Sequence, residues 1–365
     1  MLLTSITRSR TFSLTSICLW LLFAGSAINT IHAQARAYVT DRCNNSVFVI
    51  DTGTNKVVDT IPVGITPFVP AVTPDGTRVY VTHRDARMIS VIDTATDKVI
   101  STIPLAGFAW GIAITPDGTR AYVPTVSSLV SVIDTSTNTV TATIPVSFSP
   151  FNVAITPDGA KVYVTHALTL DSPRLSVIST ATNSVIHSFR IAGDPTGIAI
   201  TPDGTRAFVT SQTFFGGEII DTATDSFIDF GPLGYQIAIT PDGTRAYVGR
   251  GTEVSSIDTA TNTVVGTVQI SGLSRFLAAT ADSKRVYVCS QGDLGPDSSV
   301  AVIDTATNMV VDEIPGMTCP NGIAIAPPQF PRSKDDCKGL GYQQFGPPAF
   351  RNQGQCVRYV NEHAK

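Results

Sequence analysis

The chain alternates between short apolar runs rich in Val, Ile, Thr and Tyr and polar turns rich in Pro, Asp, Gly and Asn. One stretch shows four such runs in succession, at residues 111–114, 120–123, 130–133 and 140–144. β-Branched and aromatic residues in runs of this length, bounded by turn residues, are typical of β-strands. No amphipathic helical pattern occurs between residues 36 and 330. We therefore predict an all-β fold.

The polar turns recur at a regular period. An aromatic residue followed by Val marks the second run of each unit, and successive aromatics are 42, 42, 41, 45, 39 and 40 residues apart: Tyr38, Tyr80, Tyr122, Tyr163, Phe208, Tyr247 and Tyr287. Ile-Asp-Thr-x-Thr recurs in phase with them, at Ile50, Ile92, Ile133, Ile220, Ile257 and Ile303. Seven units of about 40 residues, each with four strands, match the blades of a β-propeller.

Two motifs predict the hairpins within each blade. Pro-Asp-Gly closes the first hairpin, because Pro presets φ and Gly accepts the positive φ that the turn requires. Asp-Thr-x-Thr closes the third hairpin, where Asp93, Asp134 and Asp258 are expected to accept backbone N–H groups.

The phase of the repeat predicts how the ring closes. The first repeat begins at a second strand (37–40), followed by strands at 47–51 and 56–61, whereas 322–325 reads as a first strand without following partners. Joining these segments completes a seventh blade from one C-terminal and three N-terminal strands, which removes an exposed sheet edge. The predicted propeller spans residues 36–330.

The motifs Tyr38-Val39-Thr40, Tyr80-Val81-Thr82 and Tyr163-Val164-Thr165, each followed by Ile-Asp-Thr or Ile-Ser-Thr, resemble the YVTN-type β-propeller repeat family, which is WD40-like. The resemblance covers about residues 36–327. It implies an exported or cell-surface seven-bladed propeller. The fourth letter of the family signature, Asn, is replaced here by Asp41, His83, Thr125, His166, Ser211, Arg250 and Ser290, so the loops that begin at these positions are not uniform.

The N-terminus has the layout of a secretory signal: Arg8 and Arg10, an apolar stretch over about 14–27, and Ala33-Gln34-Ala35. We expect a signal peptide at residues 1–35, with an uncleaved membrane anchor as the alternative. The mature chain would then be a monomer without a transmembrane segment, in the periplasm, on the cell surface or outside the cell.

The charge of the chain argues against nucleic acid as a partner. The 365 residues carry a formal net charge of −4, and removing residues 1–35 leaves 23 basic and 29 acidic residues, a net charge of −6. There is no run of Lys and Arg that would follow a phosphate backbone. We therefore expect no nucleic-acid partner.

Five cysteines follow the predicted signal peptide. Cys337 and Cys356 bracket a short tail (331–365) that departs from the repeat, and we expect a disulfide between them. Cys43 and Cys319 flank two strands that should be antiparallel neighbours in the closing blade, so a Cys43–Cys319 disulfide would lock the ring and leave Cys289 free. A Cys289–Cys319 pairing is the alternative.

Motifs for catalysis are missing from the sequence: there is no His-Glu-x-x-His, Cys-x-x-Cys, Gly-x-Ser-x-Gly or phosphate-binding Gly loop. His83 and His166 occupy one repeat slot and could form a metal or haem ligand pair; the alternative is a pair of solvent-exposed loop residues. The acidic turn residues are explained by turn formation rather than calcium binding. We therefore expect no catalytic residues, no metal and no cofactor.

The start of each first strand should lie at one mouth of the central channel. These positions hold four aromatics, one arginine and two smaller residues: Phe68, Trp110, Phe151, Tyr235, Arg275, Thr196 and Asn321. The first five are candidates for gripping a sugar, a small anion or a peptide side chain, unless the aromatics pack between blades as part of the core. Partner contacts on the same face are expected from His83, His166, Phe214 and Phe215.

The leading functional hypothesis is an exported, non-enzymatic scaffold that binds a protein, a glycan or a small ligand through this face. An enzyme is the first alternative, either a lactonase-like hydrolase or a periplasmic oxidoreductase subunit, and it rests on fold analogy alone. A structural component of the cell envelope, attached through its tail, is the second.

Overall fold

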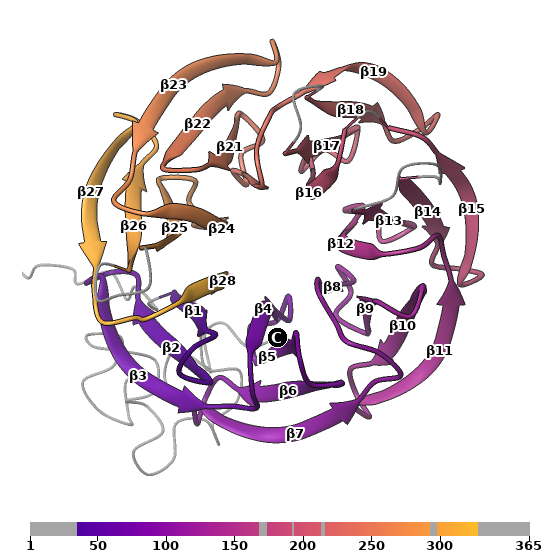
Figure 1. Cartoon of the computed structure of the whole chain (residues 1–365), viewed down its shortest axis with the longest axis horizontal. Helices are drawn as coiled ribbons and strands as arrows, with labels where there is room; N and C mark the ends of the chain where they lie inside the picture. The colour runs from indigo at the N-terminus through magenta and orange to yellow at the C-terminus, as the bar shows by residue number, and fades with distance from the viewer. Residues whose placement is uncertain (1–34, 168–173, 192, 213–215, 293–297, 328–365) are drawn as a thin grey trace, which may run out of the picture.

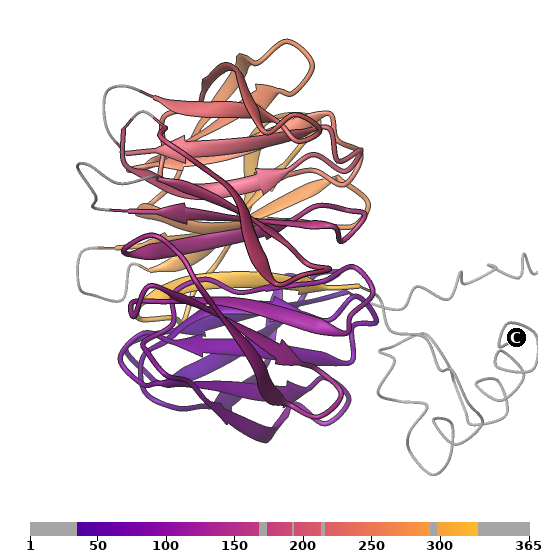
Figure 2. The ribbon, with the colours of Figure 1, turned by 90° about the vertical axis from the view of Figure 1, so that its right-hand side faces the viewer.

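The computed structural model describes residues 35–167, 174–191, 193–212, 216–292 and 298–327. Seven four-stranded antiparallel sheets are arranged as blades around a central axis (Figure 1). Figure 2 shows the same disc from its rim, with the strands of successive blades stacked beside one another. None of the described ranges contains a helix that could span a bilayer. The predicted all-β, seven-bladed propeller is confirmed.

Each blade places one strand at the axis and one at the rim. The innermost strands are β4 (Pro67–Val72), β8 (Ala113–Ile114), β12 (Pro150–Ile155), β16 (Pro195–Ile200), β20 (Gln236–Ile239), β24 (Leu273–Ala279) and β28 (Pro320–Ala326). The second strands are β1 (Arg36–Asp41), β5 (Arg78–His83), β9 (Arg120–Thr125), β13 (Lys161–His166), β17 (Arg206–Ser211), β21 (Arg245–Arg250) and β25 (Arg285–Gln291).

The outer half of each blade carries the Ile-Asp-Thr hairpin. The third strands are β2 (Ser46–Asp51), β6 (Met88–Asp93), β10 (Leu129–Asp134), β14 (Leu175–Ser179), β18 (Gly217–Asp221), β22 (Glu253–Asp258) and β26 (Ser299–Asp304). The outermost strands are β3 (Lys56–Pro62), β7 (Lys98–Pro104), β11 (Thr139–Pro145), β15 (Ser184–Phe189), β19 (Ser226–Gly231), β23 (Thr263–Gln269) and β27 (Met309–Ile314). One strand differs from prediction: β8 has two residues, because only an isolated bridge between Ala109 and Thr125 precedes it.

The turn motifs act as predicted. The glycines of the five Pro-Asp-Gly turns have φ between 70° and 73°, which a residue with a side chain rarely adopts: Gly76, Gly118, Gly159, Gly204 and Gly243. In the third hairpin, the Asp134 carboxylate accepts hydrogen bonds from the Ser136 and Thr137 N–H groups, both at 2.9 Å. Asp258 makes both contacts with the Ala260 and Thr261 N–H groups, and Asp93 accepts from the Thr96 N–H group.

The ring closes in the blade that combines both ends of the repeat region. β28 pairs antiparallel with β1, and the sheet continues through β2 and β3 (Figure 1). A disulfide joins Cys43, just after β1, to Cys319, just before β28. Cys289 is free and buried. The predicted closure and the predicted Cys43–Cys319 pairing are both confirmed, and the Cys289–Cys319 alternative is wrong.

Neighbouring blades are tied together by the repeated tyrosines. Each of six second-strand tyrosines donates a hydrogen bond to an Asn or Asp in the outer hairpin of the next blade, and each acceptor residue has a positive φ: Tyr38 to Asp97, Tyr80 to Asn138, Tyr122 to Asn183, Tyr163 to Asp225, Tyr247 to Asn308 and Tyr287 to Asn55. All six tyrosines are fully buried, so these bonds satisfy hydroxyls that would otherwise be desolvated without a partner. The repeated aromatic is thus a blade-to-blade connector.

Three predictions of domain organisation lie outside the described residues. They are the signal peptide at 1–35, apart from its last residue, the tail at 331–365 and the Cys337–Cys356 disulfide within that tail.

Candidate functional site

Five aromatic side chains meet at one end of the propeller axis. Their ring centroids are 5.3 Å apart for Phe68 and Trp110, 5.1 Å for Trp110 and Phe151, and 6.2 Å for Phe151 and Tyr235. Phe276 closes the circle, at 6.4 Å from Tyr235 and 5.9 Å from Phe68. We call these five residues the aromatic ring. Most of its contacts are edge-to-face, the geometry that the aromatic quadrupole favours.

The ring skips two blades, which carry small or polar residues at the equivalent positions. Thr196 and Gly197 lie between the strands of Phe151 and Tyr235, and Asn321 and Gly322 lie between those of Phe276 and Phe68. Four of the predicted mouth residues are therefore brought together. The fifth ring member, Phe276, was missed by the sequence analysis, which placed Arg275 in this slot.

Buried hydroxyl groups hold the backbone beneath the aromatic ring. Thr40 donates to the Phe68 carbonyl at 2.8 Å, and Thr82 donates to the Trp110 carbonyl at 2.9 Å. Thr196 donates to the Tyr235 carbonyl at 2.7 Å. Each donor comes from the preceding blade. The backbone that carries these three aromatics is therefore tied to its neighbouring blade.

Exposure divides the aromatic ring into two parts. Phe68 and Phe276 are buried, whereas Trp110, Phe151 and Tyr235 are only partly buried. The packing interpretation of these aromatics is thus supported by their mutual contacts and by the burial of two of them. The three partly exposed rings still offer a face or an edge at the mouth.

One arginine contacts the aromatic ring, and two more, Arg275 and Arg42, occupy chain segments that adjoin it. The guanidinium carbon of Arg84, which follows β5, lies 4.9 Å from the centroid of the Trp110 ring. Arg275 donates through Nε to Gln291 Oε1 at 2.7 Å. Arg42 follows β1, and its N–H donates to the Cys319 carbonyl at 3.2 Å. Within the described ranges, none of the three guanidinium groups forms an ion pair.

The charges of these arginines converge on Tyr235. Burial raises the pKa of the Tyr235 phenol, and the positive charges of Arg275, Arg84 and Arg42 partly oppose this rise. Burial lowers the pKa of Arg275, and the charge of Arg42 adds to that effect. The three cations therefore act on one region of the mouth. Arg42 and Arg84 were not predicted as site residues, because the sequence does not show which loop residues turn toward the axis.

A pair of amides crosses the axis beside the aromatic ring. Asn152 Nδ2 donates to Gln236 Oε1 at 2.9 Å, although β12 and β20 belong to blades that are not neighbours. Gln236 is 2% exposed, and its Nε2 atom has no hydrogen-bond partner. A buried donor without a partner is costly and needs an acceptor such as water or a ligand.

The histidine predictions need correction. His83 and His166 are fully buried at the ends of β5 and β13, so the expectation that they are exposed and contact a partner is wrong. Both ring nitrogens are engaged: in His83, Nδ1 contacts the Ile65 carbonyl at 2.8 Å and Nε2 contacts Ser90 Oγ at 2.9 Å. His166 repeats this arrangement with Phe148 and Ser176. Neither nitrogen is left for a metal or haem iron.

Burial lowers the pKa of both histidines, and that of His166 falls to about 4. Both therefore remain neutral near pH 7 and act as packed hydrogen-bonding groups. The physical reason for the failed prediction is that each side chain packs between the segment that precedes the first strand of its blade and the third strand of that blade.

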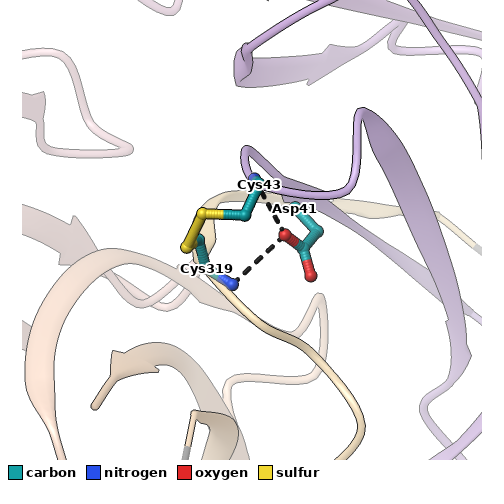
Figure 3. Close-up of side chains that lie close together, drawn as sticks. All are labelled: Asp41, Cys43 and Cys319. Carbon is teal, nitrogen blue, oxygen red and sulfur yellow. Dashed lines mark hydrogen bonds between the residues drawn. A yellow bond between two sulfur atoms is a disulfide. The ribbon is translucent and has the colours of Figure 1, made fainter. Parts of the chain in front are cut away.

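Asp41, Cys43 and Cys319 form a cluster at the ring closure whose ligand atoms lie within 4.8 Å of one another (Figure 3). Asp41 is fully buried and accepts hydrogen bonds from the Cys43, Thr318 and Cys319 N–H groups, at 3.1, 2.7 and 3.2 Å. The two sulfurs are bonded to each other. Four or more donors face the Asp41 carboxylate, which leaves it little capacity to bind a cation. This cluster therefore connects the two ends of the closing blade and is not a metal site.

The acidic residues of the Pro-Asp-Gly turns lie on the opposite face, around a pocket lined in part by Asp75, Asp117 and Arg78. The Thr115 hydroxyl and the Thr119 N–H donate to Asp117, and these bonds lower the pKa of its carboxyl group. The carboxylates therefore hold turns, as the sequence analysis proposed. Phe214 and Phe215, the remaining predicted partner residues, lie outside the described residues.

Comparison with known proteins supports the fold. A family model described as a YNCE-like β-propeller matches residues 23–120. The comparison with curated proteins found no significant match.

Several solved structures share the architecture. A hydrazine synthase chain from Kuenenia stuttgartiensis aligns with a TM-score of 0.66 and 22% identity, over 78% of this chain and 99% of that chain. A functionally unknown protein from Desulfotomaculum acetoxidans aligns with a TM-score of 0.70 and 18% identity, over 80% and 99%. The dihydro-heme d1 dehydrogenase NirN in complex with DHE aligns with a TM-score of 0.57 and 17% identity, over 78% of this chain but only 64% of NirN.

At these identities the structural likeness shows the fold alone. The YNCE-like match and the seven four-stranded blades together support the assignment of this chain to the YVTN-type β-propeller family.

Proposed function

We propose that this protein is an exported, non-enzymatic binding scaffold whose ligand site is the channel mouth. The site comprises the aromatic ring together with Arg42, Arg84 and Arg275. The observation that carries this proposal is that the guanidinium group of Arg84 lies over the partly exposed ring of Trp110, and that neither Arg84 nor Arg275 has an ion-pair partner among the described residues. Packing alone explains Phe68 and Phe276, but it does not require a cation over an exposed ring.

The rigidity of the site favours binding. The carbonyl groups beneath three of the aromatics are hydrogen-bonded to buried threonines, and the Cys43–Cys319 disulfide closes the propeller. A preorganised site loses little conformational entropy when a ligand binds. The NirN structure, which shares this fold over 64% of its chain, contains DHE, so a ligand-binding role is one that we consider for this propeller by analogy.

Export is proposed on two grounds. The first 35 residues have the pattern of a secretory signal. The Cys43–Cys319 disulfide is of a kind that persists in oxidising compartments.

The chain offers a direct spectroscopic test of the site. Its two tryptophans are Trp20, inside the proposed signal peptide, and Trp110, in the aromatic ring. The processed protein would therefore have Trp110 as its single tryptophan, and its fluorescence would report on the channel mouth. We would titrate the processed protein with phenylacetate, phenethylamine and cellobiose, following Trp110 emission and the heat of binding.

At least one of these probes is expected to bind and to shift Trp110 emission, and Trp110→Leu should abolish the heat of binding without changing the melting temperature by more than a few degrees. Binding by none of the three, or binding that Trp110→Leu leaves intact, would contradict the proposed site. Turnover of a probe would instead favour an enzyme, the class to which hydrazine synthase and NirN belong by name.

A further inference from the structure

We infer that the channel mouth binds a small aromatic oxyanion, with the flat part of the ligand against the aromatic ring and its carboxylate or phosphate between Arg275 and Arg84. This inference rests on the proposed function and names its ligand class. It follows from the charge of the site, from the hydrogen-bonding character of its polar groups and from the exposure of its aromatics.

The positive charge of the site is local and uncompensated. The chain as a whole has a net charge of −4, yet Arg84 lies over Trp110 and Arg275 directly precedes Phe276. Two basic residues at blade junctions are ion-paired, Arg36 with Asp97 at 2.8 Å and Lys161 with Asp225 at 2.9 Å. Three others donate to carbonyl groups of the next blade: Arg78, Arg120 and Arg285. Arg42, Arg84 and Arg275 have no ion-pair partner in the described part of the chain. A ligand anion would supply the missing charge.

The polar side chains of the site have unused donors. Arg275 uses only Nε in its bond to Gln291, and Nη1 and Nη2 have no acceptor among the described residues. Gln236 Nε2 is also a donor without a partner. The planar fork of a guanidinium matches the two oxygens of a carboxylate or the edge of a phosphate. A set of free donors favours a ligand that presents acceptors.

The aromatic part of the ligand is indicated by the other half of the mouth. Trp110, Phe151 and Tyr235 are partly exposed. The ring centroid of Phe151 lies 5.1 Å from that of Trp110 and 6.2 Å from that of Tyr235. One planar group, the guanidinium of Arg84, already lies over the Trp110 ring. Edge-to-face or offset contacts with a flat ligand suit such a surface. Neutral sugars also bind aromatic surfaces, but they make no use of the unpaired charges.

Three matched probes separate the contribution of the ligand's phenyl group from that of its charge. Phenylacetate has both the phenyl group and the charge, phenylacetamide has the phenyl group without the charge, and acetate has the charge without the phenyl group. We expect phenylacetate to bind at least tenfold more tightly than either, and its affinity to fall as NaCl increases because salt screens charge pairs. Phenyl phosphate, measured in parallel, distinguishes a carboxylate site from a phosphate site.

Variants assign the charge to the named arginines. Arg275→Gln should weaken phenylacetate binding at least tenfold, and Arg275→Lys should weaken it less because the charge remains while the fork is lost. Lys98→Gln, which removes a positive charge from the exposed outermost strand β7, is the matched control and should leave the affinity unchanged. Melting temperatures would verify that each variant is folded.

The result that overturns the inference is distinct from the result that overturns the proposed function. Equal affinity for phenylacetate and phenylacetamide, or an unchanged affinity in folded Arg275→Gln, would refute the anion site. If cellobiose or phenethylamine bound in a Trp110-dependent manner while phenylacetate and phenyl phosphate did not, the scaffold would stand and the ligand class would be wrong. If none of the probes bound, both the proposed binding function and the proposed ligand class would be wrong.

Discussion

The hydroxyl group of Tyr80 donates a 2.6 Å hydrogen bond to Oδ1 of Asn138 in the next blade. Asn138 occupies the turn of the outer hairpin with a φ of 55°, which directs its side chain toward the preceding blade. Five other blade junctions repeat this contact. The seventh junction has Phe208 in place of the tyrosine, and the corresponding acceptor, Asn262 Oδ1, is buried without a partner.

This exception predicts a stabilising substitution. Phe208→Tyr should supply the missing donor to Asn262 Oδ1 and raise the free energy of unfolding by about 1 kcal/mol. Tyr247→Phe, which removes the equivalent bond to Asn308, should lower it by about 1–2 kcal/mol. Urea unfolding of both variants checks the prediction. A Phe208→Tyr protein that is less stable than the parent would show that the junction has no room for the hydroxyl.

The disulfide at the ring closure is expected to be a major source of stability. Cys43 and Cys319 are separated by 276 residues, so their bond restricts the unfolded chain strongly. The double variant Cys43→Ser/Cys319→Ser should lose about 2–4 kcal/mol. Thermal or urea unfolding would measure the loss.

Peptide mapping without reduction provides the control for this pairing. It should recover a peptide that links Cys43 to Cys319, while Cys289, which is buried and has a raised pKa, should resist alkylation in the folded protein. A peptide linking Cys289 to Cys319 would contradict the structure.

The buried carboxylate of Asp41 should fasten the closing blade through hydrogen bonds. Asp41→Asn replaces one acceptor oxygen with an NH₂ group that faces backbone donors, so we expect a loss of about 1–3 kcal/mol. Hydrogen exchange should accelerate first in β28 and β1, which this carboxylate connects. Asp59→Asn, on the exposed face of β3, should change neither quantity. Equal exchange in both variants would mean that Asp41 contributes nothing to closure.

The buried histidines predict a loss of stability in mild acid. The pKa of His166 is about 4 in the folded protein and that of His83 is also lowered, whereas both approach the ordinary value of about 6.5 when unfolded. The unfolded state therefore binds more protons as the pH falls below 6.5, and stability decreases down to about pH 4. The contribution of His166 to this slope should approach about 1.4 kcal/mol per pH unit, and His83 should add to it in the same direction.

Measurement of unfolding between pH 7 and pH 4.5 checks this slope. His166→Gln should reduce it, since the glutamine does not titrate. His187→Gln, at an exposed position on β15, should retain the parent slope. A pH dependence that is identical in all three proteins would show that the buried histidines do not cause it.

The number of blades and the way in which the propeller closes could be predicted from the sequence, because the repeat has a constant phase. The spacing of Tyr38 and its equivalents counts the blades, and the run at 322–325 completes the sheet that begins at 37–40. Once two strands are known to be antiparallel neighbours, residues at their adjoining ends, such as Cys43 and Cys319, must lie close together.

Only part of the candidate site could be predicted from the sequence, and the reason is physical. Phe68, Trp110, Phe151 and Tyr235 were found through their repeat slot, but β24 has an irregular register between Ser274 and Leu277. That irregularity accompanies the insertion of Phe276, rather than Arg275, into the aromatic ring. A motif alignment counts residues and cannot detect a local change in strand register.

The sequence by itself determined the fold class, the seven blades, the turn chemistry and the closing disulfide, because each depends on local propensity and on a period along the chain. Only the tertiary structure decided which side chains of different blades meet, such as Asn152 with Gln236 and Arg84 with Trp110, and that His83 is buried. These contacts join different blades or bury a side chain beneath the segment that precedes its blade. They depend on the direction of individual side chains, which periodicity does not specify.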